Sequence, residues 1–254
     1  MADITIPADR AINHGGAEFA AGGRKFAETM KLWGGLGPQD AVLDIGSGPG
    51  RMAIGIGEMN GWSNSLIGFD VIKVDIDAAT REITSRHPSF VFHHIDAWNV
   101  HYNRGGTLQS HEISFPAEGE TIDFAFATSV FTHMFRDEVA HYLRETFRTL
   151  KPGGRLLSTW FVLDEVVRAA CNAETARYRF AHAREDGTWI ENPSKPADVV
   201  AYAHSAVVDL LSEVGFIDIH FHKGAWSRTI PKGEARHGQD VFVCSKPDLR
   251  SVQP

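Results

Sequence analysis

Three acidic side chains lie where short apolar runs end. Asp44 is near the end of AVLDI, Asp70 ends SLIGFD, and Asp96 ends FVFHHID. If these runs are neighbouring parallel strands, their carboxyl ends meet at one edge of a sheet, and the three carboxylates converge on one ligand site. Such a rim repels polyphosphate and suits a ligand that carries cations, amines and hydroxyl groups.

A glycine-rich turn follows the first run. Gly46, Gly48 and Gly50 form a G-x-G-x-G pattern before a predicted helix, which suits a phosphate loop or a tight strand-to-helix turn. Pro49 removes one N–H donor, the lysine of a P-loop is missing, and Asp44 adds negative charge, so we favour a phosphate-free ligand. S-adenosylmethionine fits, because it has an ammonium, a sulfonium, a ribose diol and an adenine amine.

The elements that must position these residues alternate along the chain. Predicted strands lie at 41–45, 65–70, 90–96, 122–128, 155–163, 216–222 and 239–245, and predicted helices at 24–36, 51–59, 75–87, 137–150 and 200–214. The sequence KPGG reads as the turn between the fourth of these helices and the next strand. The alternation predicts an α/β fold with a doubly wound, mostly parallel, seven-stranded sheet and helices on both faces.

We expect one domain over residues 1–254. It would contain a cofactor-binding core at about 24–161, an insertion at about 163–198, and a C-terminal helix and strand pair at about 200–246. The insertion shows no clear secondary-structure pattern, and we interpret it as a lid or an oligomer contact, the latter compatible with a homodimer.

Composition restricts the partners. The formal net charge is −7, which gives no electrostatic reason to bind nucleic acid or an anionic membrane. Cys171 and Cys244 have neither disulfide-scaffold nor metal-site spacing. No stretch approaches the roughly 20 apolar residues of a membrane span, and the N-terminus has no signal-peptide pattern. We therefore expect a cytoplasmic protein with a small-molecule partner.

The motifs VLDIGSGPGR, LIGFD, HIDA, IDFAFATSVFTHM and LKPGGRLLSTWF occur in that order. Over about residues 24–161 they resemble the successive motifs of class I S-adenosylmethionine-dependent methyltransferases, whose product is S-adenosylhomocysteine. SVFTHM, the HYN-x-x-G loop and GAWSR…GQD also resemble a bacterial group that is often assumed to methylate hydroxyls of sugars or natural products.

The resemblance implies a role for each matching residue. Gly46 to Gly48 would approach the methionine part of the cofactor, Asp44 would hold its ammonium, and Asp70 would accept from both ribose hydroxyls. Asp96 would accept from the adenine amine. The other residues assigned to the cofactor are Ser47, Gly50, Arg51, Val71, Ala97, Trp98, Thr128 and Ser129.

His133, just after the fourth strand, is the predicted general base. A hydroxyl is a weak nucleophile until a base takes its proton, and imidazole titrates near neutrality. Among the 13 histidines, the pair His220 and His222 shares one strand face, so metal-assisted deprotonation is the alternative. We predict no metal ligands.

The acceptor pocket is assigned to polar and aromatic residues of the long loop and the C-terminal region. The predicted acceptor residues are Tyr102, Asn103, Trp226, Arg228 and Gln239, with Asp240 beside them. The predicted activity is methyl transfer to a hydroxyl of a small polar acceptor, such as a sugar. Alternatives are an N-methyltransferase of a small amine, a protein methyltransferase and a non-catalytic cofactor-binding module. ATSVF lacks the Asn/Asp-Pro-Pro-aromatic pattern of enzymes that methylate base amines.

Overall fold

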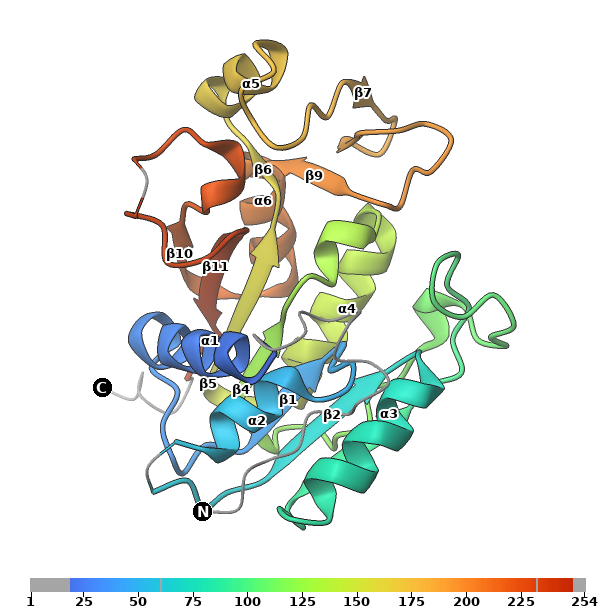
Figure 1. The fold of residues 1–254 in the computed structure, drawn as a ribbon, viewed down its shortest axis with the longest axis vertical. Helices are drawn as coiled ribbons and strands as arrows, with labels where there is room; N and C mark the ends of the chain where they lie inside the picture. Colours follow the sequence, from blue (N-terminus) through green and yellow to red (C-terminus); the bar gives the residue numbers. More distant parts are fainter. Residues whose placement is uncertain (1–18, 60, 232, 249–254) are drawn as a thin grey trace. The chain divides into compact units, whose positions relative to one another are not determined.

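The computed structural model describes residues 19–59, 61–231 and 233–248 (Figure 1). The chain divides into two compact units, residues 1–126 with 149–151 and residues 127–148 with 152–254. The α-helices are α1 (Phe19–Gly34), α2 (Arg51–Gly57), α3 (Lys73–Ala79), α4 (Arg136–Thr149), α5 (Glu165–Asn172) and α6 (His204–Val214). The strands are β1 (Val42–Ile45), β2 (Leu66–Asp70), β3 (Phe90–His94), β4 (Ile122–Ala127), β5 (Leu150–Trp160), β6 (Val162–Leu163), β7 (His182–Ala183), β8 (Thr188–Ile190), β9 (Val200–Ala203), β10 (Ile217–His222) and β11 (Asp240–Ser245).

Seven of these strands form one sheet in the order β10-β11-β5-β4-β1-β2-β3. β2 pairs in parallel with both β1 and β3, whereas β11 pairs antiparallel with β5 and β10. The antiparallel pairs follow from the direct return of the chain from β10 to β11 without a crossover helix. The predicted α/β fold with a mostly parallel seven-stranded sheet is confirmed.

In the first unit, α1 packs directly on the helix that follows the glycine loop. A Cβ atom on Gly23 would lie 2.1 Å from the carbonyl oxygen of Arg51, and one on Gly55 would lie 2.3 Å from the Gly23 backbone. Neither position has room for a side chain, so the backbones of α1 and α2 are in contact. The glycines thus set how closely α1 approaches α2.

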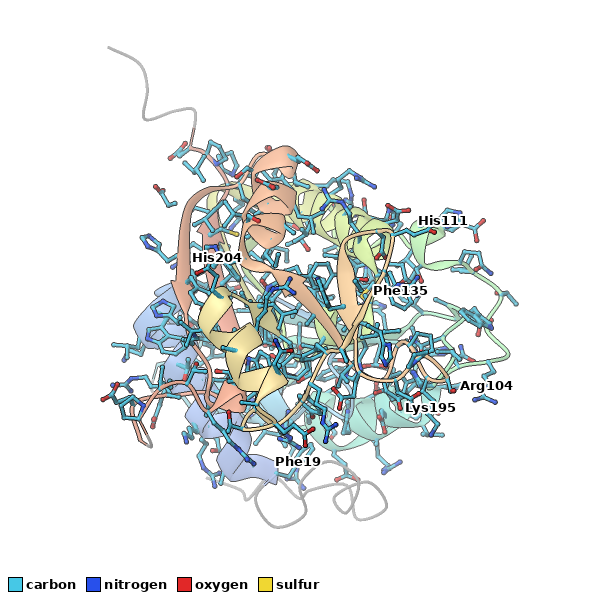
Figure 2. All side chains as sticks on the ribbon, turned by 90° about the horizontal axis from the view of Figure 1, so that it is seen from above. Phe19, Arg104, His111, Phe135, Lys195 and His204 are labelled. Atoms are coloured by element: carbon cyan, nitrogen blue, oxygen red, sulfur yellow. The ribbon has the colours of Figure 1, made fainter. Side chains whose placement is uncertain are left out.

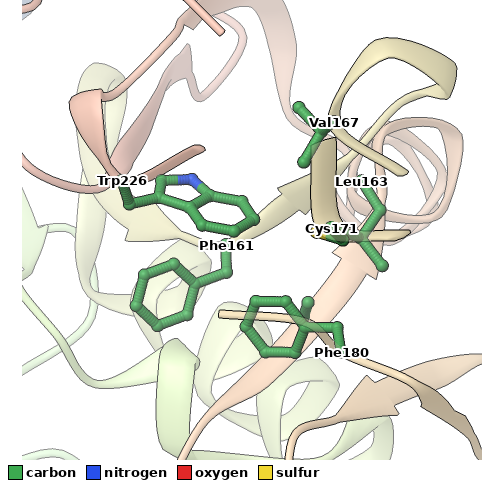
Figure 3. Packing of buried hydrophobic residues seen from close by; sticks show 7 residues of the cluster. Phe161, Leu163, Val167, Cys171, Phe180 and Trp226 are labelled. Atoms are coloured by element: carbon green, nitrogen blue, oxygen red, sulfur yellow. The ribbon is translucent and has the colours of Figure 1, made fainter. Parts of the chain in front are cut away.

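The second unit contains the residues for which the sequence indicated no structure. They form α5, β7 and β8, and the two strands belong to a small sheet with the order β6-β9-β8-β7. The same unit contains a buried hydrophobic cluster that includes the rings of Phe161, Phe180 and Trp226 (Figure 3). Their ring centroids are 5.1 to 5.6 Å apart, so Phe180 of the insertion packs on aromatic residues that lie before and after the insertion in the chain.

Two predicted boundaries are wrong. KPGG is not a turn, because β5 already begins at Leu150 and the N–H of Gly153 donates to the Lys246 carbonyl beyond β11. The helix predicted over 200–214 begins only at His204, because VAYA pairs with β8 as strand β9. In both places a pairing with a distant segment overrides the local pattern.

Candidate functional site

The glycine loop between β1 and α2 uses its backbone donors internally. The N–H groups of Gly46 and Ser47 donate to the Phe69 carbonyl oxygen at 3.0 and 2.9 Å. The N–H of Gly48 donates to Asp70 Oδ2 at 2.8 Å, and the next residue is a proline. A phosphate loop needs these donors to point at the anion. The arrangement therefore argues against a phosphate site.

The three glycines of this loop are required by its shape. All have positive φ, which strains other residues: 71° at Gly46, 51° at Gly48 and 86° at Gly50. A Cβ on Gly50 would lie 2.3 Å from Ile83 Cδ1, whereas one on Gly48 would meet nothing within 4 Å. Gly50 thus serves close packing, and Gly48 borders open space beside the end of β1.

Asp70 ties the glycine loop to the end of β2. Its Oδ2 accepts from the N–H of Gly48, and its Oδ1 accepts from the N–H of Ile72 at 2.9 Å. Burial raises the pKa of Asp70, and these two hydrogen bonds lower it. Each carboxylate oxygen has a second lone pair, so Asp70 can still accept from a ligand diol.

Asp44, in β1, is only 1% exposed, and its Oδ2 has no hydrogen-bond partner within residues 19–59, 61–231 and 233–248. Burial raises the pKa of Asp44 well above its ordinary value, and the charge of Asp70 adds to the effect. Arg51, at the start of α2, acts in the opposite direction. A buried carboxyl in this state gains most from a cationic ligand. The ammonium of S-adenosylmethionine fits that requirement.

Asp96 lies on an exposed loop and binds that loop itself. Its Oδ1 accepts from Asn103 Nδ2 and its Oδ2 from Thr107 Oγ1, both at 3.0 Å. The hydrogen bonds from Asn103 and Thr107 hold the pKa of Asp96 below its ordinary value. The sequence assigned Asp96 to the cofactor and Asn103 to the acceptor, whereas the structure pairs them with each other.

The neighbours of Asp96 are placed as follows. The N–H of Ala97, the predicted adenine donor, donates to the Ile95 carbonyl at 2.8 Å. Trp98 and Tyr102 are 43% and 50% exposed, and Val71, after β2, is half-buried. Two aromatic rings are therefore exposed on the loop that Asp96 organises.

In the second unit, the segment after β4 is held by distant side chains. Ser129 has φ of 58°, its N–H donates to Thr159 Oγ1 at 2.7 Å, and its hydroxyl donates to Gln239 Oε1 at 2.9 Å. The adjacent Thr128 is half-buried, and within the described residues its Oγ1 has no hydrogen-bond partner. Gln239, assigned to the acceptor, thus supports the strained turn at Ser129.

His133 ends the short 3-10 turn Phe131–His133 and is half-buried. Its Nδ1 lies 3.2 Å from the carbonyl oxygen of Ala197. A carbonyl oxygen can only accept, so this contact requires a proton on Nδ1. In the neutral ring the lone pair is then on Nε2.

Among the C-terminal residues assigned to the acceptor or placed beside it, Trp226 and Asp240 are buried in the second unit. Trp226 is 4% exposed and donates from Nε1 to Asp240 Oδ2 at 2.6 Å, so it offers no exposed ring face for stacking on a sugar. Asp240 also accepts from the N–H groups of Val162 and Gly224, and burial raises its pKa to about 6. Arg228 is exposed, with φ of 55°.

A methyltransferase domain family matches residues 17–216, most of the chain. The chain belongs to this family. The resemblance to class I S-adenosylmethionine-dependent methyltransferases, which the motifs indicated, is confirmed. S-adenosylmethionine is the cofactor of this methyltransferase.

Solved structures show the same fold. A SAM-dependent methyltransferase from Methanosarcina mazei is 18% identical with a TM-score of 0.53, covering 85% of this chain and 96% of that one. A protein from Pyrococcus horikoshii OT3 is 15% identical with a TM-score of 0.60, covering 92% and 93%. Human N-acetylserotonin methyltransferase, solved in complex with SAM, is 17% identical with a TM-score of 0.56, covering 95% and 57%. These likenesses concern the fold.

Sequence reasoning missed Thr159 and Tyr202 and placed Arg184 only in the predicted insertion, whereas all three contact the segment after β4. No local signal distinguishes them, because each lies on an element far along the chain. Across residues 19–59, 61–231 and 233–248, no helix has the length and apolar character of a membrane span, and no three His, Cys, Asp or Glu side chains gather as metal ligands would.

Proposed function

We propose that this methyltransferase methylates a hydroxyl group of a small polar acceptor, such as a sugar or a glycosylated metabolite, with His133 as general base. When bound, S-adenosylmethionine supplies a methyl group activated by its sulfonium. The protein then has to align the two reactants and accept the proton of the hydroxyl.

For the cofactor, the three acidic residues proposed as ligands belong to the first unit. Asp44 would face the ammonium, because its buried carboxylate has an oxygen without a partner among the described residues. Asp70 would accept from the ribose hydroxyls while it holds the N–H of Gly48. Asp96 would accept from the adenine amine with the lone pairs that Asn103 and Thr107 leave.

The observation that carries the acceptor chemistry is the hydrogen bond from His133 Nδ1 to the Ala197 carbonyl. It supports a neutral tautomer whose basic atom is Nε2, the form that a general base needs. An amine acceptor would need such a base less, because an unprotonated amine is already nucleophilic.

The test is a screen of hydroxylated metabolites and glycans with isotopically labelled cofactor. Once an acceptor is found, His133→Ala is expected to bind S-adenosylmethionine normally and to lose about 10²- to 10⁴-fold in turnover. His141→Ala, on α4 of the same unit, is the matched control and should keep its turnover. Full turnover by His133→Ala at saturating acceptor would refute the base assignment, and a requirement for magnesium after EDTA treatment would favour metal-assisted deprotonation.

A further inference from the structure

Three consecutive residues of the second unit are each contacted by the small sheet and its loops. His133 Nδ1 meets the Ala197 carbonyl at 3.2 Å, and the carbonyl of Met134 accepts from the Tyr202 hydroxyl at 2.7 Å. The guanidinium carbon of Arg184 lies 4.1 Å from the ring centroid of Phe135, which Figure 2 labels. The three contacts come from one hairpin region, residues 182–203, which contains β7, β8 and β9.

We propose that this hairpin region is a positioning element for His133. It fixes the imidazole in its Nδ1–H tautomer, with Tyr202 and Arg184 as the positioning residues. The catalytic role of this tautomer rests on the proposed function. The tautomer itself does not, because it can be measured in the protein without ligands.

The strongest of the three contacts is that of Tyr202. The side chain is 1% exposed, and burial raises the pKa of its hydroxyl well above the ordinary value, so the hydroxyl keeps its proton and donates. Its ring packs edge-on against Trp160 at 5.3 Å, and Trp160 contacts Phe131 of the same turn at 4.8 Å. Tyr202 therefore fixes the backbone immediately after His133.

Ala197 lies three residues before β9, the strand that carries Tyr202. A displacement of β9 would therefore move two groups at once: the Ala197 carbonyl, which faces the imidazole, and the Tyr202 hydroxyl, which donates to Met134. Because the hydrogen bond of one ring nitrogen determines which tautomer is present, the same displacement would change the protonation of Nε2.

Arg184 adds a contact at the other end of the segment. Its side chain is 36% exposed, and its Nε lies 3.6 Å from Asp186 Oδ1, across the turn between β7 and β8. A cation over an aromatic face is a weaker constraint at such a site than a buried hydrogen bond. Arg184 should therefore contribute less to the orientation of His133 than Tyr202 does.

The test is the ring ¹⁵N spectrum of His133 in the protein without ligands at about pH 8.5, roughly two units above the ordinary imidazole pKa. Wild type should show one tautomer, with the proton on Nδ1. Tyr202→Phe keeps the ring and removes the hydroxyl, and should lower the ratio of the Nδ1–H to the Nε2–H form at least about fivefold, the effect of one hydrogen bond. Tyr178→Phe makes the same change in the aromatic cluster and should leave the spectrum unchanged.

A second pair of variants keeps the proposal testable if Tyr202→Phe fails to fold. Arg184→Met should shift the tautomer ratio in the same direction by a smaller factor, whereas Arg177→Met, which removes a cation over Tyr178, should not. A wild-type ratio in both Tyr202→Phe and Arg184→Met, or an equal shift in the controls, would overturn the proposal. Failure of the base assignment would instead appear as turnover by His133→Ala with the tautomer results intact.

Discussion

The glycine loop and the segment after β4 are both turns that follow a buried strand, yet different parts of the chain hold them. The glycine loop is fixed by Asp70, 22 residues away, at the end of the adjacent strand. The segment after β4 depends on Thr159, Ala197, Tyr202 and Gln239, which are 30 to 110 residues away. The first turn is therefore held by a neighbouring strand, whereas the second depends on contacts with the insertion and with residues beside the C-terminal strand.

The largest expected effect concerns Asp240, the residue after Gln239, which supports the second turn. The pKa of Asp240 is about 6 in the folded protein and about 3.9 in an unfolded chain. Between these values the folded protein keeps a proton that the unfolded chain loses, so this group lowers the free energy of unfolding by about 3 kcal/mol as pH rises from about 4 to 6. Above that range its contribution is constant.

Urea denaturation at a series of pH values measures this contribution. The free energy of unfolding of Asp240→Asn, relative to wild type, should rise by about 3 kcal/mol between pH 4 and 6. Asp209→Asn, on α6 of the same unit, is the control and should track wild type. A constant difference between Asp240→Asn and wild type over this range would show that Asp240 titrates normally.

The next effect tests the local support of the glycine loop. Asp70→Ala leaves the N–H groups of Gly48 and Ile72 without their acceptor and removes the proposed ribose ligand. Loss of a hydrogen bond to a charged group costs about 2 kcal/mol, so S-adenosylmethionine should bind about thirtyfold more weakly by calorimetry. Asp77→Ala, whose carboxylate pairs with Lys73 on the surface of α3, should bind it as wild type does. Wild-type affinity in Asp70→Ala would remove the proposed cofactor site.

The smallest effect compares the two turns directly. Gln239→Leu removes the acceptor of the Ser129 hydroxyl and should lower the free energy of unfolding by about 1 kcal/mol, with little change in cofactor affinity. In a Ser129→Gly background the same substitution should cost nothing, because glycine has no hydroxyl and accepts positive φ. An undiminished cost in that background would mean that Gln239 stabilises the fold through other contacts.

The comparison also explains what the sequence could predict. The alternation of strands and helices predicted the fold class, and five motifs in order, among them the glycine loop and the strand that ends at Asp70, indicated the family, because each signal lies within one strand and its turn. The prediction of a phosphate-free ligand agrees with the inward N–H groups of the loop. These are patterns of neighbouring residues, which sequence periodicity reports well.

The rest depended on pairings that no local pattern encodes. VAYA reads as the start of a helix until β8 pairs with it, and Trp226 reads as a ligand-stacking ring until Asp240 and the aromatic cluster bury it. Asn103 was assigned to the acceptor, but its amide is a hydrogen-bond donor to Asp96. Trp226 and Asn103 suggested binding because they are an aromatic and a polar residue in loops, whereas the structure pairs both of them with other parts of the chain.

The helices α1 and α2 of the first unit contact each other through backbone atoms at Gly23 and Gly55. Most helix contacts can absorb an added methyl group by a change of rotamer, but here two backbones touch and no side chain can turn aside. An alanine at either position would require the backbone of α1 or α2 to shift. Two residues outside the glycine loop therefore limit how far α2, the helix that follows this loop, can be separated from α1. Even a change to alanine at either residue cannot be accommodated by a change of side-chain conformation.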